Sequence, residues 1–102
     1  MNQKWILAFY SIPSKPEKNR VKIYRKLQKH GALALKDGVY ILPFTPDNYE
    51  FFTWLRGEVA LFDGSMNFTT VEKLDTISDD ELIASFIALA TSTYEAIAEK
   101  IS

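Results

Sequence analysis

Residues 14–43 read SKPEKNRVKIYRKLQKHGALALKDGVYILP, a stretch that combines a helix pattern, a turn and two strand patterns. Ser14 followed by Glu17 resembles a capping box, and Pro16 falls in the first turn, where a missing N–H leaves no hydrogen bond unmade. We therefore expect a helix from this point to His30, stopped by the glycine that follows.

The second half of the stretch predicts a β-hairpin. Asp37-Gly38 is a strong turn signal between short strands at 32–35 and 39–43. Upstream, residues 4–12 are almost continuously apolar, as expected of a strand covered on both faces. Downstream, residues 67–71 are polar and alternate weakly, as expected of an edge strand.

Two more helices carry start signals. Thr45 is an N-cap ahead of Pro46, and the helix that follows softens at Gly57, ends at Asp63-Gly64 and buries Phe51, Phe52, Leu55, Val59 and Phe62. Residues 78–81 form another capping box, which opens a helix reaching the end of the chain. Its apolar side chains cover more than one stripe, which predicts contact with the sheet and with a second copy of the chain: Leu82, Ile83, Phe86, Ile87, Leu89, Ala90, Tyr94, Ile97 and Ile101.

This order of elements predicts one α+β domain over residues 1–102, with the ferredoxin-like split β-α-β plan (βαββαβ) and an additional C-terminal helix. The plan puts the first and third strands in the centre of the sheet, and these are the two most apolar runs. The chain has no cysteine, which excludes disulfides and thiolate chemistry and fits a cytoplasmic location. Its apolar N-terminal run is too short to span a membrane.

The net charge of −1 conceals an uneven distribution. Through Lys36 there are nine basic residues and one acid, giving +8, and from Asp37 onward three basic residues and twelve acids give −9. The first helix carries much of the positive charge. Its core side is expected to hold Arg20, Ile23, Tyr24 and Leu27, and helical spacing groups five cations on the opposite side, here named the basic stripe: Lys18, Lys22, Arg25, Lys26 and Lys29.

Like charges at this spacing destabilise an isolated helix by a few tenths of a kcal/mol per pair. The basic stripe therefore indicates either a bound polyanion or an acidic surface, on the same copy of the chain or a neighbouring one, that compensates the charge.

Residues for catalysis or metal binding are scarce. His30 is the single histidine and lies at a helix end, where it suits the helix dipole, and the acids at 79–81 are explained as first-turn residues. No Gly-rich phosphate loop, HExxH or Gly-x-Ser-x-Gly motif is present. We expect neither an enzyme nor a cofactor.

Tyr49 and Trp54 fall off the core face of the second helix and are expected to pack beneath loops, with partner contact as the alternative.

Several motifs, taken in order, resemble the N-terminal domain of the ChrB family of chromate-resistance regulators. They are Trp5–Pro13 (WILAFYSIP), Arg20, Tyr24–Leu27 (YRKL), Gly31-Ala32, Asp37–Pro43 (DGVYILP), Glu50–Leu55 (EFFTWL) and, more loosely, Phe86 and Tyr94. The same pattern is similar to the middle domain of PaaX-type repressors and, more distantly, to small CRISPR-associated scaffold nucleases.

The ChrB resemblance implies a ferredoxin-like domain of a repressor that controls a chromate-efflux operon and releases DNA when chromate is present. Such regulators also carry a C-terminal domain, so we expect this chain to be a fragment or a stand-alone relative. The nuclease relatives place a metal-binding Asp at the end of the first strand. This chain has Tyr10-Ser11-Ile12 there, so the resemblance implies no metal site and no nuclease activity.

The sequence thus supports a DNA-binding regulatory domain whose basic stripe contacts phosphates, with an oxyanion such as chromate bound by Arg20, Arg25 or backbone donors. The alternative is a protein–protein interaction domain, for example a homodimer in which the basic stripe docks on the acidic half of another copy. A residual metal-dependent nuclease is the third hypothesis.

Overall fold

The protein is described from a computed structural model, covering residues 4–101, with side chains through residue 90. Four antiparallel strands form one sheet in the order β2-β3-β1-β4. The predicted α+β class and ferredoxin-like plan are therefore confirmed, with β1 and β3 in the centre. The elements are β1 (Trp5–Ser11), α1 (Glu17–His30), β2 (Leu33–Lys36), β3 (Val39–Pro43), α2 (Pro46–Leu61), β4 (Ser65–Val71) and the additional helix α3 (Asp79–Ile101).

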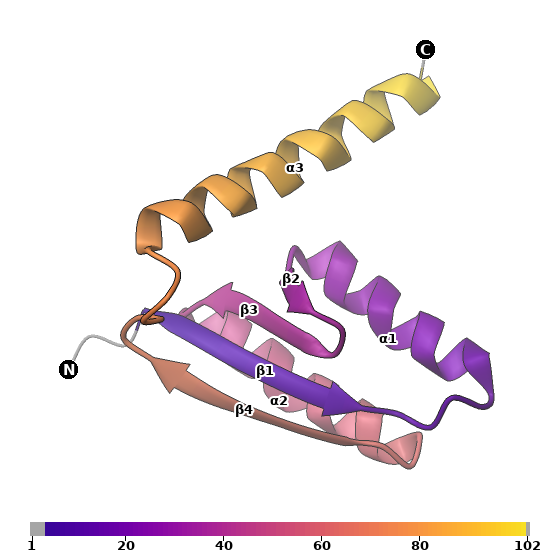
Figure 1. Ribbon diagram of the computed structural model, residues 1–102. Coiled ribbons are helices and arrows are strands. Elements are labelled where there is room, and N and C mark those ends of the chain that lie inside the picture. The colour runs from indigo at the N-terminus through magenta and orange to yellow at the C-terminus, as the bar shows by residue number, and fades with distance from the viewer. Residues whose placement is uncertain (1–3, 102) are drawn as a thin grey trace.

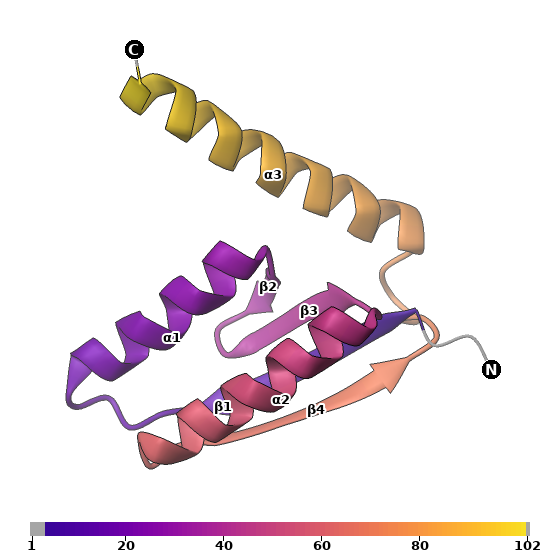
Figure 2. The ribbon, with the colours of Figure 1, turned by 180° about the vertical axis from the view of Figure 1, so that it is seen from behind.

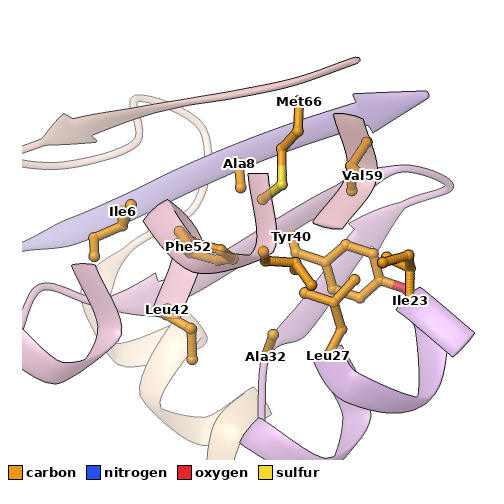
Figure 3. Packing of buried hydrophobic residues seen from close by; sticks show 11 residues of the cluster. Ile6, Ala8, Ile23, Leu27, Ala32, Tyr40, Leu42, Phe52, Val59 and Met66 are labelled. Atoms are coloured by element: carbon orange, nitrogen blue, oxygen red, sulfur yellow. The ribbon is translucent and has the colours of Figure 1, made fainter. Parts of the chain in front are cut away.

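The sheet separates two apolar clusters. The helix α2 lies behind the strands in Figure 1 and in front of them in Figure 2. On one face, α1 and α2 bury Ile23 and Phe52 against strand residues that include Tyr40. Figure 3 shows the Tyr40 ring lying beside Ile23. On the other face, Leu82 near the start of α3 packs with Trp5 and Ile41. Because side chains alternate along a strand, β1 supplies both clusters.

Several predicted helix boundaries are confirmed. The Thr45 hydroxyl accepts the Asn48 N–H at 3.0 Å, and the Ser78 hydroxyl accepts the Glu81 N–H at 3.1 Å. Gly31 ends α1 in the left-handed conformation, with φ of 87°. These ends follow from local side-chain chemistry, which is why the sequence was enough to place them.

Other boundaries were predicted wrongly. Pro16 is the extended N-cap of α1, at φ −73° and ψ 141°, so Glu17 is the first helical residue and no side chain caps the helix. The expected capping box of Ser14 is absent for that reason. β2 begins one residue later than expected, because the Ala32 N–H still bonds the Leu27 carbonyl at 3.0 Å as part of the helix end. The helix α2 passes through Gly57 without a break.

The expected core face of α1 is narrower than the sequence suggests. Ile23 and Leu27 are fully buried, but Arg20 is exposed and Tyr24 is 46% exposed. The helix α1 therefore buries one row of side chains, which contains Ile23 and Leu27, and leaves the neighbouring row with Arg20 and Tyr24 at the surface. On α3, Leu82 is buried while Ile83 and Ile87 are exposed, and the side chains of Tyr94, Ile97 and Ile101 lie outside the described residues.

Candidate nucleic-acid interface

The basic stripe lies along α1, as its helical spacing predicts. Its five cations border an open concavity of about 560 Å³, whose lining is completed by Glu17 and Val21. Four lysines and one arginine therefore face one carboxylate. Such a concentration of positive charge along one helix can bind a chain of phosphates.

The five cations of the stripe divide into two groups. Lys22 Nζ lies 5.7 Å from the centre of the Phe62 ring, and Lys26 Nζ lies 4.7 Å from that of Trp54, both on α2 or directly after it. These two cations help to join the helices. The remaining three make no hydrogen bond, ion pair or cation–π contact with residues 4–90: Lys18, Arg25 and Lys29.

His30 continues the row of contacts between α1 and α2. Its ring stacks on Phe51 with the ring centres 3.8 Å apart, and its Nε2 hydrogen-bonds Asn48 Oδ1 at 2.8 Å. The Asn48 amide donates its own N–H to the Pro43 carbonyl, so its oxygen is the acceptor and His30 Nε2 is the donor. His30 therefore serves packing at the end of α1.

The acids whose side chains the structure describes, within residues 4–90, form no ion pair with the basic stripe. Among the described side chains, the single ion pair joins Lys4 Nζ to Asp79 Oδ2 at 3.0 Å, and the Trp5 indole also donates to Asp79 at 2.9 Å. These two donors, the indole first, hold the pKa of Asp79 below its usual value. Within the described part, each cation of the basic stripe is more than 4.0 Å from any carboxylate oxygen.

The two arginines proposed as alternative oxyanion ligands, Arg20 and Arg25, lie in different hollows. Arg20 borders a hollow of about 350 Å³, here named the tyrosine pocket, whose lining also contains Tyr10, Glu17, Val21, Tyr24, Asp37, Gly38 and Tyr40. Arg25 instead belongs to the basic stripe and borders a separate hollow beside Lys29. Five residues along a helix turn the side chains well apart, so a single ligand site containing both is not formed.

In the tyrosine pocket, burial is the largest cause that raises the pKa of Tyr40 to about 12, and the neighbouring Tyr10, Tyr24 and Asp37 raise it further. Burial also raises the pKa of Tyr10. Both phenols therefore stay neutral and able to donate hydrogen bonds at physiological pH. In the described part of the chain, no three acidic or histidine side chains gather where they could hold a metal ion.

The comparisons with known proteins agree with this architecture. The family of the PaaX protein central Cas2-like domain matches residues 1–83. The chain belongs to this family. Protein ChrB of Cupriavidus metallidurans is 30% identical over 82 residues, which cover 80% of this chain and 25% of that protein. The chain thus spans a quarter of the length of that relative. No solved structure matches this chain.

The predicted resemblance to ChrB and PaaX is therefore confirmed. At the end of β1, Tyr10 and Ser11 are followed by Ile12. These three residues border a second hollow, of about 170 Å³, whose lining also contains Asp37 from the β2–β3 turn. Between residues 4 and 101, no helix has the length and apolar character needed to cross a bilayer.

Sequence reasoning missed two features of this Cas2-like domain. It did not pair Lys26 with Trp54, which is 47% exposed and lies under a lysine rather than under a loop. It also did not bring Asp37 to the end of β1. That second placement was accessible, because antiparallel pairing of β1 and β3 puts the β2–β3 turn beside the last residues of β1.

Proposed function

We propose that this chain is a non-enzymatic regulatory domain related to chromate resistance, which binds DNA through the basic stripe. One observation carries the proposal: Lys18, Arg25 and Lys29 are exposed on one helix and uncompensated by the described acids of the chain. Exposed cations release counterions from DNA when they contact phosphates. The similarity to ChrB supports the regulatory part. Binding to DNA requires a cytoplasmic location, which a cysteine-free chain suits.

The test compares two triple variants with the same change of charge. In one, Lys18, Arg25 and Lys29 become alanine, and in the control Lys15, Lys36 and Lys73, which are also exposed, become alanine. Fluorescence anisotropy with duplex DNA from upstream of the gene gives the dissociation constant at several salt concentrations.

We expect the stripe variant to bind more weakly and to reduce the log–log salt slope by up to about 2.7, from about 0.9 per lost phosphate contact. The control should change the slope by less than about 1. If the unaltered chain does not bind this DNA at low salt, or if both triples behave alike, the proposal is wrong.

We further propose that an oxyanion such as chromate binds at Arg25 rather than Arg20. Arg20 shares its pocket with Glu17 and Asp37, whose carboxylates repel a dianion, whereas Arg25 stands among lysines. Isothermal calorimetry with chromate and with sulfate should give heat that Arg25→Ala removes and Arg20→Ala retains. The absence of heat with either anion would exclude this response for the domain.

A second candidate function rests on exposed apolar side chains. Phe9 at 47%, Ile83 at 50% and Ile87 at 62% exposure are large apolar groups in contact with water, which favours an interaction or homodimerisation domain. Light scattering on the purified chain tests this alternative. A dimer that Ile83→Ser with Ile87→Ser converts to a monomer, without change in DNA binding, would support it, and a monomer at all concentrations would contradict it.

A further inference from the structure

The tyrosine pocket lies between the end of β1, the first half of α1 and the β2–β3 turn. Its volume is about 350 Å³, and it shares Tyr10, Arg20, Asp37 and Gly38 with the neighbouring hollow of about 170 Å³. A flat molecule the size of a nucleobase fits this space with room for its sugar at the opening. Neither the basic stripe nor the sheet core uses these polar groups.

Aromatic rings form the walls. Tyr10 and Tyr40 are stacked, with ring centres 6.0 Å apart and planes 23° from parallel, and Tyr40 is only 6% exposed. Tyr24 stands at the rim and leaves 46% of its surface open to the pocket and solvent. An unstacked base can stack on the exposed Tyr24 ring, and base–aromatic stacking contributes about 1–3 kcal/mol per base.

The polar groups of the pocket are complementary to a ligand that carries hydrogen-bond acceptors and donors side by side. The Arg20 guanidinium only donates hydrogen bonds and the Asp37 carboxylate only accepts them, and the two are more than 4.0 Å apart, so neither is consumed by an ion pair with the other. A ligand with adjacent acceptors and donors can satisfy both. Guanine has this pattern on its Watson–Crick edge, where the O6 acceptor lies next to the N1–H and N2 amino donors.

From this arrangement we propose that the tyrosine pocket binds an unpaired guanine base. A free oxyanion fits less well, because Glu17 and Asp37 outnumber Arg20. The base must be unpaired, since a duplex occupies the N1–H and N2 donors that Asp37 would accept.

The pocket is also continuous with the basic stripe. Glu17 and Val21 line both concavities, so a strand whose phosphates follow Lys18 and Lys22 passes the mouth of the pocket. This part of the inference rests on the proposed function. A free guanine nucleoside would use the same pocket without the stripe.

The experiment measures anisotropy of labelled oligothymidylate, of the same strand with one central guanine, and of that strand annealed to its complement. The ratio of the first two dissociation constants cancels the contribution of the basic stripe. We expect the guanine strand to bind about 5- to 20-fold more tightly, as one well-formed base contact provides. We expect Tyr24→Ala, Arg20→Ala and Asp37→Asn each to bring the ratio near one. Tyr49→Ala is the matched control, because Tyr49 is also 46% exposed and lies outside the pocket, and it should keep the ratio.

Calorimetry with guanosine separates the two sources of the base. If neither the single strands nor the duplex bind but guanosine does, and Tyr24→Ala abolishes that heat, the pocket is a nucleoside site and the proposed DNA function is wrong. If strands and duplex bind equally with or without guanine, the pocket proposal is overturned while the basic stripe stands. If single strands, duplex and guanosine all fail to bind, both proposals are rejected.

Discussion

Replacing Gly38 with alanine should lower the free energy of unfolding by about 2–3 kcal/mol, from two separate effects. Gly38 has φ of 76°, a region that costs an L-residue about 1–2 kcal/mol. An added Cβ would also lie 2.7 Å from the Tyr10 carbonyl oxygen, so the backbone must move. That movement strains the 2.9 Å hydrogen bond from the Tyr10 N–H to the Gly38 carbonyl, with a loss of about 1 kcal/mol.

Two other glycines separate the effects. Gly31 has φ of 87° but nothing within 4 Å of a Cβ, so Gly31→Ala should lose only the conformational part, about 1–2 kcal/mol. Gly57 lies inside α2 with nothing within 4 Å, so Gly57→Ala should stabilise the domain by about 0.5–1 kcal/mol.

Urea denaturation followed by circular dichroism gives all three values. With a slope of about 1–2 kcal/mol per molar urea, Gly38→Ala should lower the midpoint by about 1–3 M. A Gly38→Ala midpoint no lower than that of Gly31→Ala would refute the reasoning, because the close approach of Tyr10 would then contribute nothing.

Two further predictions concern pH. Because burial raises the pKa of Tyr40 to about 12, above its unfolded value near 10, its stabilisation is complete below about pH 10 and is lost as the pH rises to 12. Tyr40→Phe should therefore flatten stability against pH in that alkaline range, as measured by thermal unfolding. The pKa of Asp79 is lowered by the Trp5 indole and by Lys4, so this stabilisation is present above the usual carboxyl pKa and is lost as the pH falls through the folded value. In a Trp54→Phe background, the fluorescence of Trp5 should show an acid transition that Asp79→Asn abolishes.

Local signals in the sequence carried much of the fold. The apolar runs identified β1 and β3 as central, and Thr45, Ser78 and Gly31 marked helix ends through contacts within a few residues. The Ser14 prediction failed because the extended Pro16 separates that serine from the first helical turn. Such a failure depends on one backbone conformation, which residue types alone do not specify.

The candidate interface was predicted in part for the same reason. Helical spacing was enough to group the basic stripe on α1, since it needs one helix only. The packing of Lys26 on Trp54 requires the placement of α1 beside α2. The meeting of Tyr10 with Asp37 requires the β2–β3 turn to lie at the end of β1. The first is a tertiary relation that no local pattern encodes, whereas the second follows once β1 and β3 are paired antiparallel.

The strand β1 connects two distant parts of the molecule. Trp5 at its beginning holds the start of α3 through Asp79, and Tyr10 near its other end forms a wall of the tyrosine pocket. Five residues of strand separate them by about 16 Å. Because β1 is paired on both sides, it cannot slip by one residue without turning its apolar side chains to the wrong faces. Trp5 and Tyr10 therefore keep a fixed spacing, and the contact with α3 and the wall of the tyrosine pocket stand at opposite ends of one strand.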